Sequence, residues 1–185
     1  MSLGSLTVLV GPTAVGKGTV VRRLREIYPD LPVSVSVTTR APRPGEVDGK
    51  DYFFVSNAHF DELVKSGALL EWAVVHGQNR YGTPARWVQD QREAGNPVLL
   101  ELDVEGARQV RQRQPECLLV FLMPPSWEEL ERRLTGRATE GSEEQARRLQ
   151  TARSELEAIS EFDVVLTNHD VDRTAEELAA LLDLN

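Results

Sequence analysis

The most informative segment of this 185-residue chain is Gly11-Pro12-Thr13-Ala14-Val15-Gly16-Lys17-Gly18-Thr19. It follows Leu6–Val10, an apolar and β-branched run that predicts a buried strand, and it opens a stretch at 20–28 with helical spacing of apolar residues. In such a strand–loop–helix connection, glycines let backbone N–H groups turn toward an anion, and the helix dipole favours negative charge. The segment therefore predicts a phosphate-binding loop in which Lys17 reaches the β- and γ-phosphates of a nucleotide.

Short apolar strands and amphipathic helices alternate along the rest of the chain. Further β-branched or apolar runs predict strands at 33–39, 98–102, 118–123 and 164–166. Helical patterns lie near 105–113, 126–135, 143–159 and 174–182. Ser126-x-x-Glu129 and Ser142-x-x-Gln145 have the form of capping boxes that start two of these helices. This alternation predicts an α/β fold with a mostly parallel sheet between two helical layers.

Two stretches interrupt the alternation within what we expect to be one domain over residues 1–185. Residues 36–85 form a strand-rich insert, with apolar runs at 51–55 and 69–76, and residues 126–160 are almost wholly helical and rich in Arg and Glu. The predicted core is then 1–35, 86–125 and 161–185. Both inserts are open to two interpretations, as ordinary surface decoration or as mobile covers over a substrate.

Composition excludes several classes of protein. No apolar run approaches the ~20 residues that span a bilayer, so we expect no membrane association. With 29 acidic and 21 basic residues, the net charge of −8 disfavours nucleic acid as a partner. The single cysteine, Cys117, can form neither an internal disulfide nor a cysteine metal cluster. The N-terminus has no secretory pattern, so we expect a cytoplasmic protein.

The loop departs from the usual pattern at one position. Gly18 stands where a Ser or Thr hydroxyl normally contacts Mg²⁺, and the hydroxyl follows at Thr19. This ending resembles the nucleoside monophosphate kinases, in which phosphates and water hold most of the Mg²⁺ coordination. We therefore expect Mg²⁺ as a cofactor and assign it no protein ligand.

Ordered motifs over nearly the whole chain resemble the guanylate kinases. They are Ser34-Val-Ser36-Val-Thr-Thr39-Arg40-Ala-Pro-Arg43-Pro-Gly45-Glu46, Gly49-Lys-Asp-Tyr52-Phe53-Phe54-Val55, Leu70-Glu71-Trp72-Ala73, Asn79-Arg-Tyr81-Gly82-Thr83, Glu101-Leu-Asp103-Val-Glu-Gly106, Pro124-Pro-Ser126, Arg132-Arg133-Leu134-x-Gly136-Arg137, Arg147-Arg148-Leu149 and Val165-Leu-Thr-Asn168. The resemblance implies a P-loop kinase fold, with 36–85 as the GMP-binding insert and 126–160 as a lid. It also implies ATP-dependent phosphorylation of GMP, and of dGMP, to the diphosphate with release of ADP, in purine nucleotide metabolism.

The resemblance assigns four residues to the guanine base. A carboxylate can accept hydrogen bonds from both N1–H and the N2 amino group of guanine, whereas adenine has a bare acceptor at N1. Glu71 matches the family residue in that role, with Asp103 accepting a further bond from N2, and the hydroxyls of Ser36 and Thr83 would bond the opposite base edge. The alternatives are that Glu71 is a solvated strand residue and that Thr83-Pro84 caps a helix.

A second group matches the residues that bind the GMP phosphate. Arg40 and Arg43 flank Ala41-Pro42, where the proline stiffens the loop, and Tyr52 and Tyr81 resemble phenols that donate to the same phosphate. The alternative for both tyrosines is a half-buried core position with a wet hydroxyl.

The helical insert carries three arginines that match those closing over ATP: Arg133, Arg137 and Arg148. With Lys17 and Arg40 they form the expected catalytic set, and Asn168 matches a position near the adenine. A salt-bridged surface is the alternative, since Glu129 and Arg133 are four residues apart. Ala138 replaces a glycine common after the lid arginine, which reduces backbone freedom there.

Three other functions compete with this one. A non-catalytic guanylate-kinase-like binding module would typically lose loop residues such as Lys17, which is present. An enzyme acting on another acceptor would not need Glu71 with Ser36 and Asp103. A signalling GTPase would have no obvious use for the paired arginines. The chain alone does not decide its oligomeric state.

Overall fold

Four parallel strands form the central sheet of the computed structural model, which describes residues 3–75, 78–136 and 142–184. In their order across the sheet, β6-β1-β7-β8, they are Val98–Glu101, Leu6–Val10, Leu118–Met123 and Val164–Thr167. Every residue of β1 is buried, as expected of a strand covered on both faces. The predicted α/β class and parallel sheet are confirmed.

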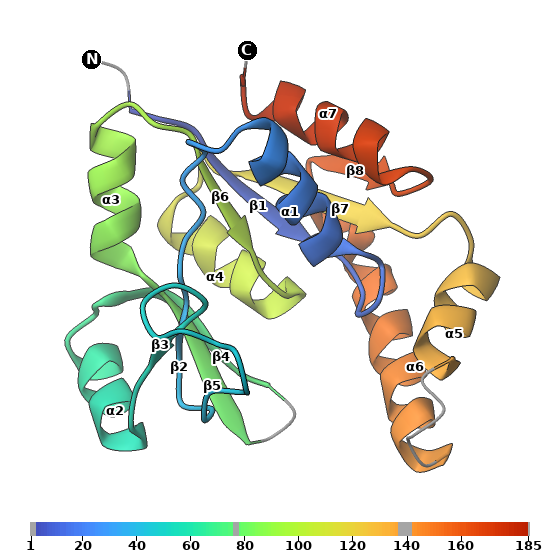
Figure 1. Cartoon of the computed structure of the whole chain (residues 1–185), viewed down its shortest axis with the longest axis horizontal. Helices are drawn as coiled ribbons and strands as arrows, with labels where there is room; N and C mark the ends of the chain where they lie inside the picture. The colour runs from blue at the N-terminus through green and yellow to red at the C-terminus, as the bar shows by residue number, and fades with distance from the viewer. Residues whose placement is uncertain (1–2, 76–77, 137–141, 185) are drawn as a thin grey trace.

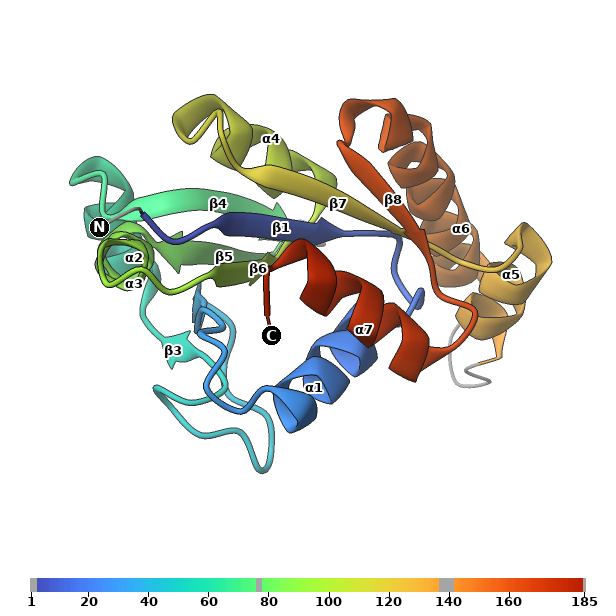
Figure 2. The same ribbon diagram turned by 90° about the horizontal axis from the view of Figure 1, so that it is seen from above.

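Helices cover both faces of this sheet, which makes three layers (Figure 2). The helices are α1 (Lys17–Ile27) and α7 (Val171–Leu181) on one face, with α4 (Val104–Arg113) and α6 (Ser142–Glu157) on the other. Alternate residues of β1 point to opposite faces: Leu9 packs with Leu24 of α1, and Val8 packs with Val110 of α4. The loop from β1 to α1 lies at the carboxyl ends of the strands, where open α/β sheets bind ligands.

The helical stretch after β7 begins with α5 (Trp127–Thr135) and continues through α6 and the short 3₁₀ helix η1 (Ala158–Glu161). The Ser126 hydroxyl accepts the backbone N–H of Glu129, 3.1 Å away, so this predicted cap is confirmed. The second predicted cap, at Ser142, lies outside the described side chains.

A second sheet of mixed direction lies beside the first one (Figure 1). In its order β3-β2-β5-β4, the strands are Phe53–Phe54, Val37–Thr38, Asn79–Pro84 and Leu69–Val75. Helix α2 (Asn57–Lys65) packs its buried Phe60 against Val37 and Leu69, and α3 (Ala85–Glu93) leads back to β6. This sheet places its last strand, β4, next to α4 of the main unit.

The expected strand at 33–39 is wrong as a single element. Val33 makes one parallel bridge to Leu99 of β6, whereas Val37–Thr38 pair with β3 and β5 in the other sheet. The chain therefore crosses from one sheet to the other within this stretch. Similarly, the run at 51–55 pairs with another strand at Phe53–Phe54 and otherwise makes an isolated bridge from Tyr52 to Asp48. Alternating polarity predicts an extended backbone but not the strand with which it pairs.

None of the described helices combines the length and the apolar character needed to cross a bilayer.

Candidate nucleotide-binding site

The conformation of the loop between β1 and α1 is fixed by a left-handed backbone at Gly16 and by the buried side-chain amide of Asn168. Gly16 has a φ of 101°, and the Nδ2 of Asn168, after β8, donates to the Val15 carbonyl oxygen at 2.9 Å. A Cβ on Gly16 would lie 2.8 Å from that Nδ2, so conformation and space both require glycine. Asn168 also accepts the Thr174 hydroxyl at 3.2 Å. The structure thus gives Asn168 a loop-supporting contact, and its place near adenine stays a prediction.

Lys17, the first residue of α1, lies over this loop and donates from Nζ to the Gly11 carbonyl. Burial lowers the pKa of Lys17, and the nearby carboxylates of Glu155, Glu101 and Asp103 oppose that shift. These carboxylates favour the charged ammonium in a pocket that would otherwise disfavour it. The arrangement supplies a cation beside the backbone that would surround a phosphate.

Two of these carboxylates, Glu101 and Glu155, are absent from the site residues predicted from the sequence. Glu101 ends β6, and Glu155 lies on α6, near the backbone of Thr13. Burial raises the pKa of both carboxyls, and Lys17 opposes the rise. Glu101 carries a usable signal, because an acid at the carboxyl end of a buried strand faces the ligand side of the sheet. Glu155 lies inside a helical pattern and has no such signal.

Glu71 is a buried carboxylate on β4, with 4% of its surface exposed. Its Oε1 accepts the hydroxyl of Thr83 at 2.6 Å across the β4–β5 pair. Burial is the main cause that raises the pKa of Glu71 to about 7, and the charge of Asp103 adds to it. The solvated-strand alternative for Glu71 is therefore wrong. The Thr83 hydroxyl is engaged by Glu71, and Pro84, the residue before α3, makes no side-chain cap.

Asp103 and Glu71 meet over the first turn of α4. Oδ1 of Asp103 accepts the Gly106 backbone N–H at 2.7 Å and caps the helix. A Cβ on Gly106 would lie 3.0 Å from Glu71 Oε2 and 3.1 Å from Asp103 Oδ1, so the absence of a side chain lets both carboxylates approach the backbone. The two predicted base-recognition acids are thus neighbours in space although they are 32 positions apart.

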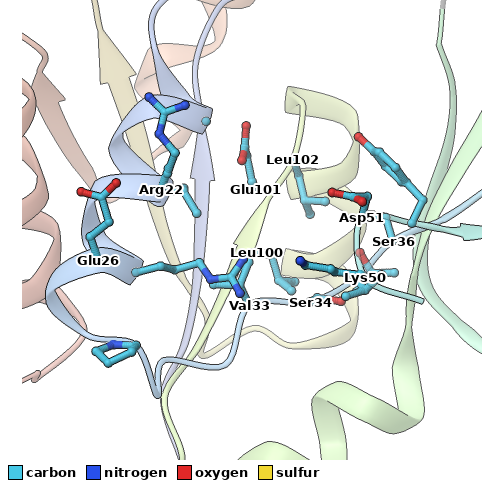
Figure 3. Close-up of a pocket in the computed structure, with 17 residues that line it drawn as sticks. Arg22, Glu26, Val33, Ser34, Ser36, Lys50, Asp51, Leu100, Glu101 and Leu102 are labelled. Atoms are coloured by element: carbon cyan, nitrogen blue, oxygen red, sulfur yellow. The ribbon is translucent and has the colours of Figure 1, made fainter. Parts of the chain in front are cut away.

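A cavity of about 660 Å³ lies between α1, the end of β6 and the second sheet, and of the groups described above Glu101 and Thr83 line it. In Figure 3, Glu101 and Leu102 lie at the end of β6 and face the cavity, with Ser36, Lys50 and Asp51 on the opposite wall. Gly18, Tyr52 and Thr83 also line it. The structure therefore brings the phosphate-binding loop and the predicted GMP-binding residues Ser36, Tyr52 and Thr83 to one cleft, of the size of small-molecule sites.

The loop that carries Arg40 and Arg43 is closed by its own carboxylate, Glu46. Arg40 binds Glu46 with both terminal nitrogens, at 2.8 and 2.9 Å, and the backbone N–H of Arg43 donates to Glu46 at 2.7 Å. These bonds lower the pKa of Glu46 to about 2 and raise that of Arg40. Glu46 belongs to a quoted motif, but no sequence pattern assigns it this contact. The loop can therefore bind an anion, and in this structure the carboxylate of Glu46 occupies that position.

The two predicted phosphate-binding tyrosines flank Arg40. Nε of Arg40 donates to the Tyr81 hydroxyl at 3.2 Å, and the Arg40 guanidinium lies 5.2 Å from the centre of the Tyr52 ring. The two rings pack edge to face at 5.8 Å. Both tyrosines are half-buried, as the alternative interpretation expects, yet Tyr81 already contacts the predicted clamp.

From the helical segment after β7, Arg133 of α5 reaches the phosphate-binding loop. It donates from Nε to Glu129 at 2.9 Å and from Nη1 to the Val15 carbonyl at 3.5 Å. The expected surface pair with Glu129 is present, and so is a contact with the loop. Arg148 lies on α6, and Arg137 and Ala138 lie outside the described residues.

The residues near Gly18 fit a metal ion held mainly by a nucleotide. Among the described residues, no cluster of three or more His, Cys, Asp or Glu side chains could hold a metal alone. Glu101 is the carboxylate nearest to Gly18: its Oε1 lies 3.8 Å from the point that a Cβ on Gly18 would occupy. A hydrated Mg²⁺ suits one carboxylate plus phosphates and water.

Comparison with known proteins gives a consistent result. The sequence model of the guanylate kinase family matches residues 4–185. The chain is 59% identical over 181 residues to a guanylate kinase of Mycobacterium sp. (strain MCS), covering 97% of this chain and 91% of that one, and 59% identical over 179 residues to one of Nocardia farcinica, covering 96% and 93%. Among solved structures, the guanylate kinase of Anaplasma phagocytophilum superposes with a TM-score of 0.79 at 36% identity, over 98% of this chain and 86% of that one.

Proposed function

The chain belongs to the guanylate kinase family, and from that premise we propose how its own residues carry out the reaction. The reaction is the transfer of the γ-phosphoryl group of ATP to GMP, which gives GDP and ADP. We assign the segment 36–85 to GMP binding and the segment at about 126–160 to a lid over ATP. Each assignment rests on contacts of this chain.

The observation that carries the choice of acceptor is the buried carboxylate of Glu71, which accepts the hydroxyl of Thr83 in the wall of the cavity. An ionised carboxylate in a dry pocket needs two hydrogen-bond donors side by side, and the N1–H and N2 amino group of guanine supply them. Asp103, which meets Glu71 over Gly106, would accept the second N2 hydrogen. Adenine has an acceptor at N1 and would offer Glu71 no pair of donors, and a buried polar group that lacks a partner costs about 1–3 kcal/mol.

The acceptor phosphate would replace Glu46 as the partner of Arg40. A phosphate offers the same two oxygens to the guanidinium and carries more charge than a carboxylate. Arg43 would complete the clamp from the same loop, and Tyr52 and Tyr81 would donate their hydroxyls. Glu46 then serves to hold Arg40 in place until GMP arrives.

On the donor side, the backbone of residues 11–19 and Lys17 would bind the ATP phosphates. Arg133, Arg137 and Arg148 would approach from the lid, and Asn168 fixes the loop through Val15. Glu101 is the carboxylate that would lie nearest to a bound Mg²⁺, which would supply positive charge to the ATP phosphates.

In phosphoryl transfer these residues position the substrates and neutralise charge, and they form no covalent bond with the substrates. The terminal phosphates carry about two negative charges each, so donor and acceptor repel until cations lie between them. Lys17 and the arginines of the clamp and lid supply that charge. Closure of the two inserts would exclude water, so that GMP receives the phosphoryl group.

The proposed role of Glu71 predicts a proton release when GMP binds. The pKa of Glu71 is raised to about 7 in the free protein, whereas the complex requires the ionised carboxylate. We expect GMP to displace about half a proton to one proton from Glu71 near pH 6.5. The affinity for GMP should therefore rise with pH up to about 7 and then level off.

Titration calorimetry in buffers of different ionisation enthalpy measures this release. The Glu71→Gln variant is the matched control, because it keeps the shape of the site and leaves the titration of the GMP phosphate unchanged. Wild type should release more protons than the variant by the expected amount. Equal proton release in both proteins would remove the ionising Glu71 from the GMP site.

A further inference from the structure

Strand β4 is the outer strand of the second sheet, so half of its peptide groups have no partner strand. The peptide groups of Trp72 point instead at helix α4. The Gln109 side chain donates from Nε2 to the Trp72 carbonyl at 2.8 Å and accepts the Trp72 N–H at 3.1 Å. An amide side chain presents one donor and one acceptor, as a strand peptide does. Gln109 therefore takes the place of a neighbouring strand at this one residue.

Arg113, one turn further along α4, fixes the other side of the same segment. Its Nη1 donates to the carbonyls of Leu69 and Leu70, at 2.5 and 2.8 Å. The pairing of β4 with β5 is irregular between Leu69 and Glu71. Where the pairing of β4 with β5 is irregular, side chains of α4 bind the backbone of β4. The residues on both sides of Glu71 are therefore held in place by α4.

The same helix carries the second acid of the proposed base pocket. Asp103 caps the first turn of α4, and Gly106 in that turn lies against both Asp103 and Glu71. The relative position of the two acids thus depends on how β4 sits on α4. Among the contacts described between these elements, those of Gln109 hold Trp72, on one side of Glu71, and one of those of Arg113 holds Leu70, on the other.

We propose that Gln109 is a positioning residue for base selection: by holding Trp72, it sets the place of Glu71 relative to Asp103. This inference rests on the proposed role of Glu71 in guanine recognition. The two acids must then meet N1–H and the N2 amino group at the same time, which requires their spacing to be fixed. Loss of Gln109 should reduce the preference for guanine over hypoxanthine, which has N1–H but lacks the 2-amino group.

The test compares Gln109→Ala and Gln109→Glu with Gln112→Ala, an exposed glutamine on the same helix. For Gln109→Ala, we expect kcat/KM for GMP to fall about tenfold, and the ratio of GMP to IMP to fall by a similar factor, as for the loss of one hydrogen-bonded pair. The KM for ATP should not change. Gln109→Glu keeps the volume and the acceptor but loses the donor, so it should shift the ratio in the same direction, and it decides the question if the alanine variant does not fold.

A double variant separates positioning from general stability. In a Glu71→Gln background, Gln109→Ala should add little to the loss with GMP, because the group that it positions is already changed. Full additivity, or wild-type GMP:IMP selectivity in both Gln109 variants while Glu71→Gln loses it, would overturn this inference alone. Unchanged selectivity in Glu71→Gln itself would overturn the proposed base recognition, and this inference with it.

Discussion

Replacing Lys17 with methionine is expected to lower kcat by about 10²–10³-fold, the usual effect of removing one group that stabilises transition-state charge. Lys17 is the cation that the structure places on the phosphate-binding loop, over the Gly11 carbonyl. Methionine keeps most of the length of the side chain and removes the charge. Steady-state ADP formation at saturating ATP and GMP measures the effect.

The fold of this variant should survive, because burial already disfavours the charged amine of Lys17. Thermal unfolding is the check, and Lys65→Met, on the exposed end of α2, is the matched control. The KM for GMP should stay near its wild-type value, since Lys17 would act on the donor. A kcat close to that of wild type would contradict the assignment of Lys17 to the reaction.

Glu71→Gln should lower kcat/KM for GMP by about 10²–10³-fold, the equivalent of two hydrogen bonds to a charged acceptor. The variant amide would also direct an N–H group at the N–H groups of guanine. In the proposed arrangement the segment 11–19 binds ATP, and Glu71 lies on another element, so the KM for ATP should change little. Parallel titrations of GMP and ATP in the kinase assay measure both effects.

Glu62→Gln, an exposed glutamate on α2, controls for the loss of one negative charge from the same insert. It should behave as wild type with both substrates. Equal losses for GMP and ATP in Glu71→Gln would indicate general damage and would take base recognition away from Glu71.

Local patterns in the sequence predicted the core of the fold well. The run at 6–10 gives a strand with the expected bounds, and the loop after it opens α1. Leu118–Met123 likewise forms β7. Apolar runs and the glycines of the loop determine these elements. Both signals act over a few residues and do not depend on distant partners.

The second sheet was harder to predict, because its pairing is not local. Val37–Thr38 pairs with strands that begin 16 and 42 positions later, and nothing in an alternating valine–serine run identifies those partners. The bounds of helices α2 and α3 were not predicted from the sequence. Each is nine residues long, and such short helices depend on packing more than on propensity.

For the site, motif matching identified residues that would contact the substrates, but not the residues that hold those side chains in place. Glu71 and Thr83 were assigned to opposite edges of the base, whereas their side chains are bonded to each other. Glu46 and Gln109 act through contacts that only the folded chain creates. Such partners carry no local signal, because a hydrogen bond between distant residues leaves no spacing to detect.

The most direct test of the account is an assay of ADP formation with Mg²⁺–ATP and GMP, AMP, CMP or UMP as acceptor, run in parallel on the unmodified chain. The structure buries the carboxylate of Glu71 beside Asp103 and bonds it to Thr83, which lines the proposed acceptor cleft, so turnover should be confined to GMP. Turnover with another base at a comparable rate would contradict the role of Glu71. GMP binding without turnover on any acceptor would contradict catalysis by this site.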